Sequence, residues 1–239
     1  MALQKTFAYD ELFKIRPSFN NHEFDDEHKV LIIDDFYENA EDIYEAINQR
    51  SYPMWKYSPE RDSENGERYL DARIVDKIGH PTRLHNMEMQ RVLNLCRQYW
   101  WKGDYHWADL FEVNCFQTIT EYDTKYQHYP HIDSELSCPD EFATLNMLIY
   151  LDKEDNGGTA IYGGEWISNN EDKALLYPVE DLFNLEHVIE AKFNRCVIFP
   201  GNRMHGAWCD DYAAYSGDKW RFTQVRFFHP QQMQNDGMR

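Results

Sequence analysis

Short apolar runs separated by turn residues fill the second half of the chain. They are rich in β-branched and aromatic side chains, which is typical of strands. The runs cover residues 110–119, 143–151, 157–164, 187–191, 195–199 and 220–228. No helical pattern long enough for a parallel crossover lies between them. The second half therefore predicts an antiparallel double sheet or barrel of the jelly-roll type.

The first half combines one strand pattern with two helix patterns. Residues 29–36 (KVLIIDDF) are a short apolar run ended by acids, which predicts a buried strand. Residues 38–50 predict a helix, because Asn39 suits its N-cap, acids fill its first turn and Ile43 begins an i, i+3, i+4 apolar stripe. Residues 81–101 predict the longest helix, with a proline in its first turn and a glycine just beyond its end.

No linker and no internal repeat divides the chain, so we expect residues 1–239 to form a single domain. The expected fold is mainly β with flanking helices. Residues 1–107 are the helical and strand flanking region, and its polar opening, residues 1–28, is expected to wrap the surface. Residues 108–229 are expected to form the jelly-roll core.

Composition narrows the classes of partner. The hydrophobic fraction of 42% and the aromatic fraction of 15% are ample for a folded core. The chain has 24 basic and 42 acidic residues, a formal net charge of −18. Such a charge repels phosphate backbones, so nucleic acid is disfavoured as the main partner. An amino acid, a peptide or another small molecule is favoured as a substrate, and the oligomeric state stays open.

The cysteines and the N-terminal sequence favour a cytoplasmic location. Five scattered cysteines form no CxxC pair, which fits buried thiols in a reduced protein. The N-terminus lacks the apolar stretch of a signal peptide. No apolar run approaches the length of about 18 residues that a membrane-spanning helix needs.

The stretch HYPHIDS, residues 128–134, suggests a metal site. In an extended segment residues i and i+2 point the same way, so His131 and Asp133 can reach one ion. The best third ligand is His205, which follows a predicted strand and the turn PGN. Two histidines and one carboxylate on one face are the arrangement of non-haem iron(II) oxygenases. His128 is the competing ligand, but its spacing turns it elsewhere.

The last predicted strand offers an anchor for a carboxylate. Arg221 and Thr223 share one face of residues 220–228, because alternate residues of a strand point the same way. A guanidinium can hold a carboxylate with two hydrogen bonds, and a hydroxyl adds a third. Arg226, on the other face beside aromatic residues, ranks second as the anchor.

Four segments in the same order resemble the iron(II)/2-oxoglutarate-dependent oxygenases, most strongly the prolyl-hydroxylase-like branch. They are HYPHIDS, ATLNMLIYLDKEDNGGTAIY, NRCVIFPGNRMHGAW and RFT, and the resemblance covers roughly residues 108–229. It implies a double-stranded β-helix core. Residues 29–47 also resemble the strand and helix that open bacterial and phage members whose substrates are unassigned.

The resemblance implies a set of functional residues. His131, Asp133 and His205 match the metal ligands, and Arg221 with Thr223 matches the 2-oxoglutarate anchor. One departure is the segment between His205 and Arg221, which is longer than in many members. The branch also often adds a tyrosine to the cofactor contacts; the candidates here are Tyr126, Tyr129 and Tyr150.

The implied activity is a dioxygenase that couples decarboxylation of 2-oxoglutarate to hydroxylation of a substrate. Iron(II) and 2-oxoglutarate are the implied cofactors, O2 is the co-substrate and ascorbate is a reductant. One alternative is a jelly-roll metal-binding or sensing protein without oxygenase turnover. Another is a hydrolytic or isomerising metalloenzyme on the same fold.

Overall fold

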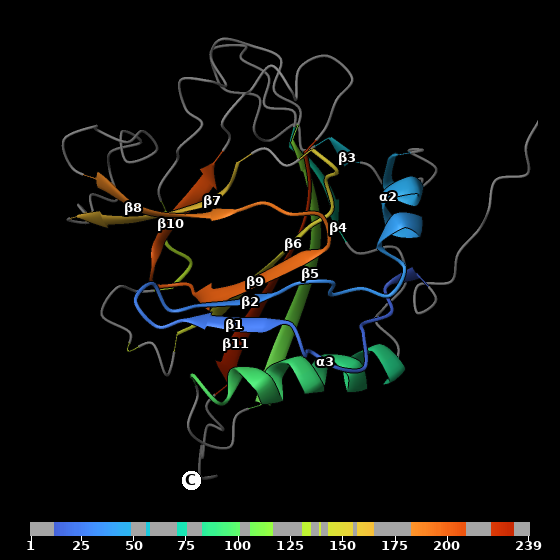
Figure 1. Cartoon of the computed structure of the whole chain (residues 1–239), viewed down its shortest axis with the longest axis horizontal. Coiled ribbons are helices and arrows are strands. Elements are labelled where there is room, and N and C mark those ends of the chain that lie inside the picture. Colours follow the sequence, from blue (N-terminus) through green and yellow to red (C-terminus); the bar gives the residue numbers. More distant parts are fainter. Residues whose placement is uncertain are drawn as a thin grey trace, which may run out of the picture.

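A computed structural model describes residues 12–48, 56–57, 71–75, 83–100, 106–116, 131–134, 139, 143–154, 157–164, 183–208 and 221–231. Within these ranges the strands form two antiparallel sheets (Figure 1). In order across the larger sheet these are β1 (His22–Asp25), β2 (Val30–Ile33), β9 (Arg195–Pro200), β6 (Leu145–Tyr150), β11 (Arg221–Gln231), β5 (His106–Phe116), β4 (Asp71–Val75) and β3 (Lys56–Tyr57). The smaller sheet has the order β10 (Met204–Trp208), β7 (Gly158–Gly164) and β8 (Phe183–Glu190).

Strands β6 and β9 of the larger sheet bury apolar side chains on both faces. Met147 of β6 and Ile198 of β9 belong to a core on the helical side, whereas their neighbours Val197 and Phe199 belong to a core with Ile161 of the smaller sheet. Side chains that alternate along a strand reach opposite faces, so each strand contributes to both cores. Continuous apolar runs such as residues 196–199 are the sequence signature of this double burial.

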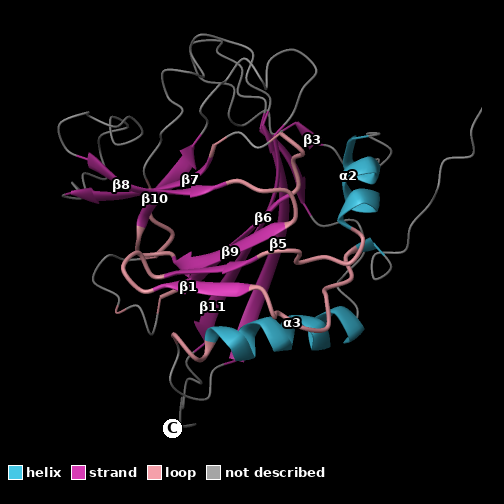
Figure 2. Cartoon of the chain, viewed as in Figure 1, coloured by secondary structure: helices cyan, strands magenta, loops and turns pink. Residues whose placement is uncertain are grey.

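Two helices cover the face of the larger sheet that is turned away from the smaller one. They are α2 (Ala40–Asn48) and α3 (Arg83–Cys96). Figure 2 shows α3 across the lower edge of the view and α2 to the right, both outside the sheets. Ile43 of α2 and Val92 of α3 are fully buried in the same core as Met147. The fold is therefore mainly β with flanking helices around a jelly-roll core, as the sequence predicts.

All the strands and both helices predicted from the sequence are present, with shifted ends. The helix predicted over residues 81–101 is described only from Arg83 and ends at Cys96, five residues earlier than expected. Its expected tail instead turns, and Tyr99 stacks on Phe24 at 3.9 Å between ring centroids while Trp100 meets the same ring edge-on. Burial of these large rings outweighs the local preference to continue the helix.

Four strands were not predicted. β1 has the sequence HEFD and lies at the edge of the sheet, where charged side chains are expected to obscure the apolar pattern. β10 is short and contains a glycine, and it lies where the sequence suggested only a turn and a histidine. β3 and β4 also come from the flanking region. The flanking region, residues 1–107, therefore extends the larger sheet at both edges, with β1 and β2 at one edge and β3 and β4 at the other.

Asn194 connects the turn before β9 to the loop that precedes α2. Its φ of 65° lies in the left-handed region, which asparagine tolerates better than most residues. Its side-chain Oδ1 accepts a hydrogen bond from the amide of Tyr37 at 2.8 Å, and its Nδ2 donates to the carbonyl of the same residue at 2.9 Å. Its carbonyl also accepts from the amide of Phe36. One buried side chain thus fixes where the chain enters α2.

The expectations of buried thiols and of no membrane-spanning helix can be compared only with the described residues. Cys96 and Cys196 are buried free thiols, whereas the side chains of the other cysteines lie outside the described residues. Neither described helix has the length and hydropathy needed to cross a bilayer.

Replacing Asn194 by alanine is expected to lower the free energy of unfolding by about 2–4 kcal/mol, because two buried hydrogen bonds are lost and alanine is strained at positive φ. The Asn194→Gly variant relieves the strain but not the lost bonds, so it should lie about 1 kcal/mol closer to the wild type. Urea unfolding measures both. Two variants within 0.5 kcal/mol of the wild type, roughly the size of a neutral surface change, would contradict this role.

Candidate metal centre

The backbone brings His131 and His205 together although they lie far apart in the sequence. The amide of each donates to the carbonyl of the other, at 2.9 and 3.0 Å, which makes an isolated antiparallel bridge. His205 belongs to β10. The next residues are tied in the same way, because the amides of Asp133 and Ser134 both donate to the carbonyl of Gly201. The segment 131–134 is therefore held against the turn between β9 and β10.

The side chains of His131, Asp133 and His205 converge. One ligand atom from each lies within 4.8 Å of the other two. The Asp133 Oδ2 atom is 3.2 Å from His205 Nε2, and Asp133 Oδ1 is 4.0 Å from His131 Nε2. The side chain of His205 is only 7% exposed, whereas that of His131 is 43% exposed. The cluster is thus buried on one side and open on the other.

The ring of His205 is held in one orientation. Its Nδ1 lies 2.8 Å from the carbonyl oxygen of Arg203, so Nδ1 carries the proton and donates this bond. The ring also meets Phe199 edge-on, with 4.8 Å between centroids. Because Nδ1 is engaged by Arg203, Nε2 is the nitrogen that faces Asp133, and it offers its lone pair to a metal ion whenever it carries no proton.

Asp133 is ionised in this setting. Burial opposes ionisation, but the hydrogen bond and charge of His205, the charge of His131 and a hydrogen bond from Asn146 outweigh it. Together they hold the pKa of Asp133 below its ordinary value. The cluster therefore offers one anionic oxygen beside two imidazoles.

Asn146 is a site residue that the sequence analysis missed. It lies on β6, is 1% exposed, and its Nδ2 donates to Asp133 Oδ2 at 2.5 Å. The same Nδ2 lies 3.3 Å from His205 Nε2, while Oδ1 is buried without a hydrogen bond from the residues described. The available signal was a lone polar residue in the apolar strand LNMLIY, since a buried amide needs polar partners.

Gly201 provides the space in which these groups meet. A Cβ atom built on it would lie 3.2 Å from Asn146 Oδ1 and 3.3 Å from the Cβ of Asp133. Both contacts are tighter than most real Cβ contacts, so a side chain here would push the carboxylate and the amide apart. The glycine of the PGN turn thus has a packing role beside Asp133.

Strand β11 places Thr223 and Arg226 on opposite faces. Thr223 pairs with Tyr150, a residue of the core between the sheets, and the buried Thr223 Oγ1 has no hydrogen bond among the described residues. Arg221 is two residues earlier in β11, and its side chain lies outside the described residues. Arg226 is fully buried on the other face, and its Nη1 lies 3.5 Å from the sulfur of Met89 in α3.

Of the three candidate tyrosines, only Tyr150 lies in the described part of the chain. Its hydroxyl is 2.7 Å from Thr159 Oγ1 of β7, inside the core between the sheets. Tyr126, Tyr129 and the competing ligand His128 lie outside the described residues. Their roles, like the assignment of the three ligands, stay predictions.

The comparisons with known proteins show the fold. No model of a known protein family matches the chain, and no curated protein matches it in sequence. HygX from Streptomyces hygroscopicus with nickel and 2-oxoglutarate bound has a TM-score of 0.55 and 13% identity, over 84% of this chain and 83% of that one. HygX with hygromycin B also bound gives a TM-score of 0.54 and 14% identity over the same shares. At this identity the likeness supports the jelly-roll architecture alone.

The three clustered side chains are expected to hold one nickel ion per chain. Alanine at position 131, 133 or 205 removes a ligand, so each variant should bind one equivalent fewer than the wild type in calorimetric titrations. The His128→Ala variant is the matched control and should lose none. Loss of this equivalent in His128→Ala, or its retention in the other three variants, would show that the ligand set is wrong.

Asn146 is expected to position Asp133 for the ion. The Asn146→Ala variant lacks the amide, so the affinity of the Asp133 site for nickel should fall by about 10- to 100-fold, as for other residues that orient metal ligands. Asn184, an exposed asparagine on β8, provides the control, and Asn184→Ala should leave nickel affinity unchanged. Equal affinities for the two variants would leave Asn146 with a packing role only.

Proposed function

We propose that this protein is an iron(II)- and 2-oxoglutarate-dependent dioxygenase that hydroxylates a small molecule or a peptide. The observation that carries the proposal is the convergence of His131, Asp133 and His205 on a jelly-roll scaffold. The finer assignment to the prolyl-hydroxylase-like branch rests on the four sequence segments alone.

The donor set fits iron(II). Two imidazoles and one carboxylate on one side of an ion leave its remaining positions for exchangeable ligands, which is the pattern of non-haem iron(II) oxygenases. The Arg203 carbonyl holds the His205 tautomer that ligates, and Asn146 holds the carboxylate. The exposed edge of His131 leaves a side from which small molecules can approach. Nickel, which HygX holds in its structure, accepts the same kinds of donor.

The face of β11 that bears Thr223 suits 2-oxoglutarate. In the proposal Arg221 forks onto the distal carboxylate and Thr223 Oγ1 donates to it, which gives a partner to a buried hydroxyl that lacks one among the described residues. The contact of Arg226 with α3 supports the choice of Arg221. Tyr150, which pairs with Thr223, is then the described tyrosine nearest to this anchor along the sheet.

The protein supplies binding, orientation and a dry setting. Iron(II) with 2-oxoglutarate supplies the activation of O2 when bound, and ascorbate can keep the metal reduced. His131, Asp133 and His205 hold the metal on one side, and Arg221 with Thr223 sets the direction of the 2-oxo acid. Phe199 packs on the His205 ring and excludes water from its buried face. The neighbours of Asp133 lower its pKa, which favours the ionised carboxylate that a metal ion requires.

The substrate class is proposed from the net charge of the protein. A net charge of −18 disfavours nucleic acids, so an amino acid, a peptide or another small molecule is proposed, in the cytoplasm. HygX with hygromycin B bound shows that a protein of this fold can hold a small molecule together with nickel and 2-oxoglutarate.

The direct test is formation of succinate from 2-oxoglutarate by the purified protein with iron(II), ascorbate and O2. Arg221→Ala should raise the 2-oxoglutarate concentration for half-maximal turnover by about 10- to 100-fold, because charge-assisted hydrogen bonds are lost. Arg226→Met is the matched control and should leave that concentration unchanged, because Arg226 lies on the other face of β11 beside Met89 of α3. Circular dichroism confirms that each variant folds.

Two outcomes would contradict the proposal in different ways. Metal binding without any succinate, alone or with candidate substrates, would favour a metal-binding or sensing protein. Loss of 2-oxoglutarate binding in Arg226→Met but not in Arg221→Ala would move the anchor to the other face of β11.

A further inference from the structure

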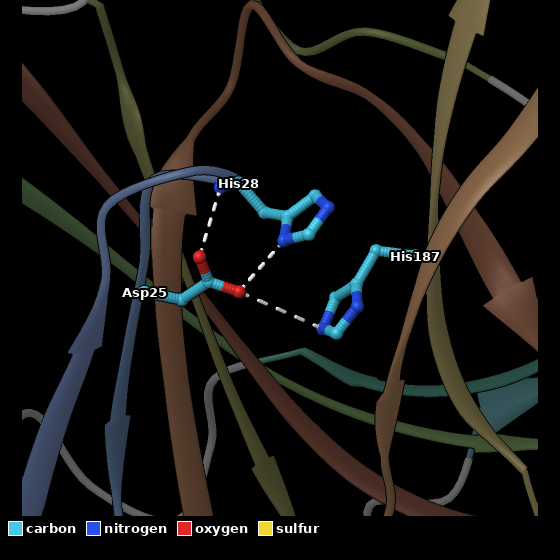
Figure 3. A group of neighbouring side chains, drawn as sticks. All are labelled: Asp25, His28 and His187. Atoms are coloured by element: carbon cyan, nitrogen blue, oxygen red, sulfur yellow. Dashed lines mark hydrogen bonds and ion pairs between the residues drawn. The ribbon is translucent and has the colours of Figure 1, made fainter.

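A second group of metal-ligating side chains lies at the opposite edge of the smaller sheet, at β8. Asp25 ends β1, His28 lies in the turn that leads into β2, and His187 lies on β8. One donor atom from each lies within 4.8 Å of the other two. Figure 3 shows both rings turned toward one oxygen of Asp25.

The carboxylate of Asp25 is oriented by its own turn. Its Oδ1 accepts hydrogen bonds from the amides of Glu27 and His28, both at 3.0 Å. Its Oδ2 therefore faces the histidines, at 2.7 Å from His28 Nδ1 and 4.0 Å from His187 Nε2. A tetrahedral ion with bonds of about 2.1 Å keeps its ligand atoms about 3.4 Å apart. The two observed separations bracket that value.

The two imidazole rings of the cluster are stacked side by side. Their centroids are 4.1 Å apart and their planes are 13° from parallel. Both rings can therefore present a nitrogen at their edges to one ion beside the Asp25 oxygen. Glu27 and Glu190 add negative charge near His187, which favours a cation at this cluster.

The two histidines of the cluster lie close in sequence to buried core residues. Val30 and Ile189, each two residues beyond a histidine of the cluster, are buried in the core between the sheets. Across the smaller sheet, His187 pairs with Ile161, which pairs with His205. Residues paired in this way share one face, so the two clusters lie on the same face of the smaller sheet, about 10 Å apart by strand spacing.

We infer that Asp25, His28 and His187 form a second site for a divalent transition-metal ion, with zinc as the best fit. Zinc accepts two imidazole nitrogens and one carboxylate oxygen, and water completes its tetrahedron. The ion links β1 and β8, which are the edge strands of the larger and the smaller sheet. Its role is to tie the two sheets together, and it takes no part in the proposed oxidation.

The test is a zinc titration of the full chain after treatment with a chelator. The titration uses the Asp133→Ala/His205→Ala double variant, in which two ligands of the first cluster are removed. Its result therefore does not depend on the proposed function. This background should bind one zinc ion and gain thermal stability from it. If the double variant fails to fold, the wild type should bind two zinc ions and His187→Ala only one.

Three substitutions and two matched controls locate the site. His28→Ala, His187→Ala and Asp25→Asn should each weaken zinc binding by about 100-fold or more and abolish the zinc-dependent rise in Tm; Asp25→Asn keeps an oxygen for the turn. His22→Ala and Asp26→Asn change an exposed histidine and a neighbouring acid outside the cluster, and they should change neither readout. Binding of no zinc by the folded background, or unaltered binding in His28→Ala and His187→Ala, would overturn the inference.

Discussion

The reciprocal hydrogen bonds between His131 and His205 are the contact on which the candidate site depends. They join a segment outside the main strands to β10, and the amides of Asp133 and Ser134 continue the connection to Gly201. Backbone pairing is directional, so it fixes where each side chain points as well as where it lies. Once the segment is seated, the carboxylate meets the buried ring of His205 and the amide of Asn146. The donor set is therefore prepared by the fold before any ion arrives.

A second constraint is the separation of faces in the larger sheet. Each central strand sends alternate residues to the helices and to the smaller sheet, as Ile198 and Phe199 illustrate. Polar groups on the inner face, such as Asn146 and Thr223, lie among apolar neighbours and need partners there. Arg226, on the helical face, meets α3. The polar groups of the candidate site thus lie on the inner face beside the core between the sheets, whereas the other face of the same strands packs against the helices.

The sequence predicted the fold class because strands such as β6 and β9 are mostly apolar on both faces. Residues 196–199 are an unbroken apolar run, and such runs can be recognised in the sequence without knowledge of the tertiary structure. The edge strand β1 was not legible, since three of its four residues are polar. The end of α3 was misplaced because it depends on the contact between Tyr99 and Phe24, which no local pattern reveals.

Some candidate site residues could be proposed from their spacing and order in the sequence. Others could be found only from the register of the paired strands. His131, Asp133 and His205 could be proposed because the first two are two residues apart and the third follows a strand and a turn. Asn146 became visible only when β6 was placed beside β9, opposite Phe199. The pair His28 and His187 likewise comes together only through the meeting of two sheet edges.

We propose that the cluster of His131, Asp133 and His205 holds iron(II) together with 2-oxoglutarate. Anaerobic titration of iron(II) in the presence of 2-oxoglutarate, followed by visible absorption, tests it most directly, because chelation of the metal by the 2-oxo acid produces a charge-transfer band. We expect a band that saturates at one iron per chain and is absent without 2-oxoglutarate and in His205→Ala. If the band is absent from the wild-type protein, or persists in His205→Ala, this cluster does not hold iron(II) with 2-oxoglutarate.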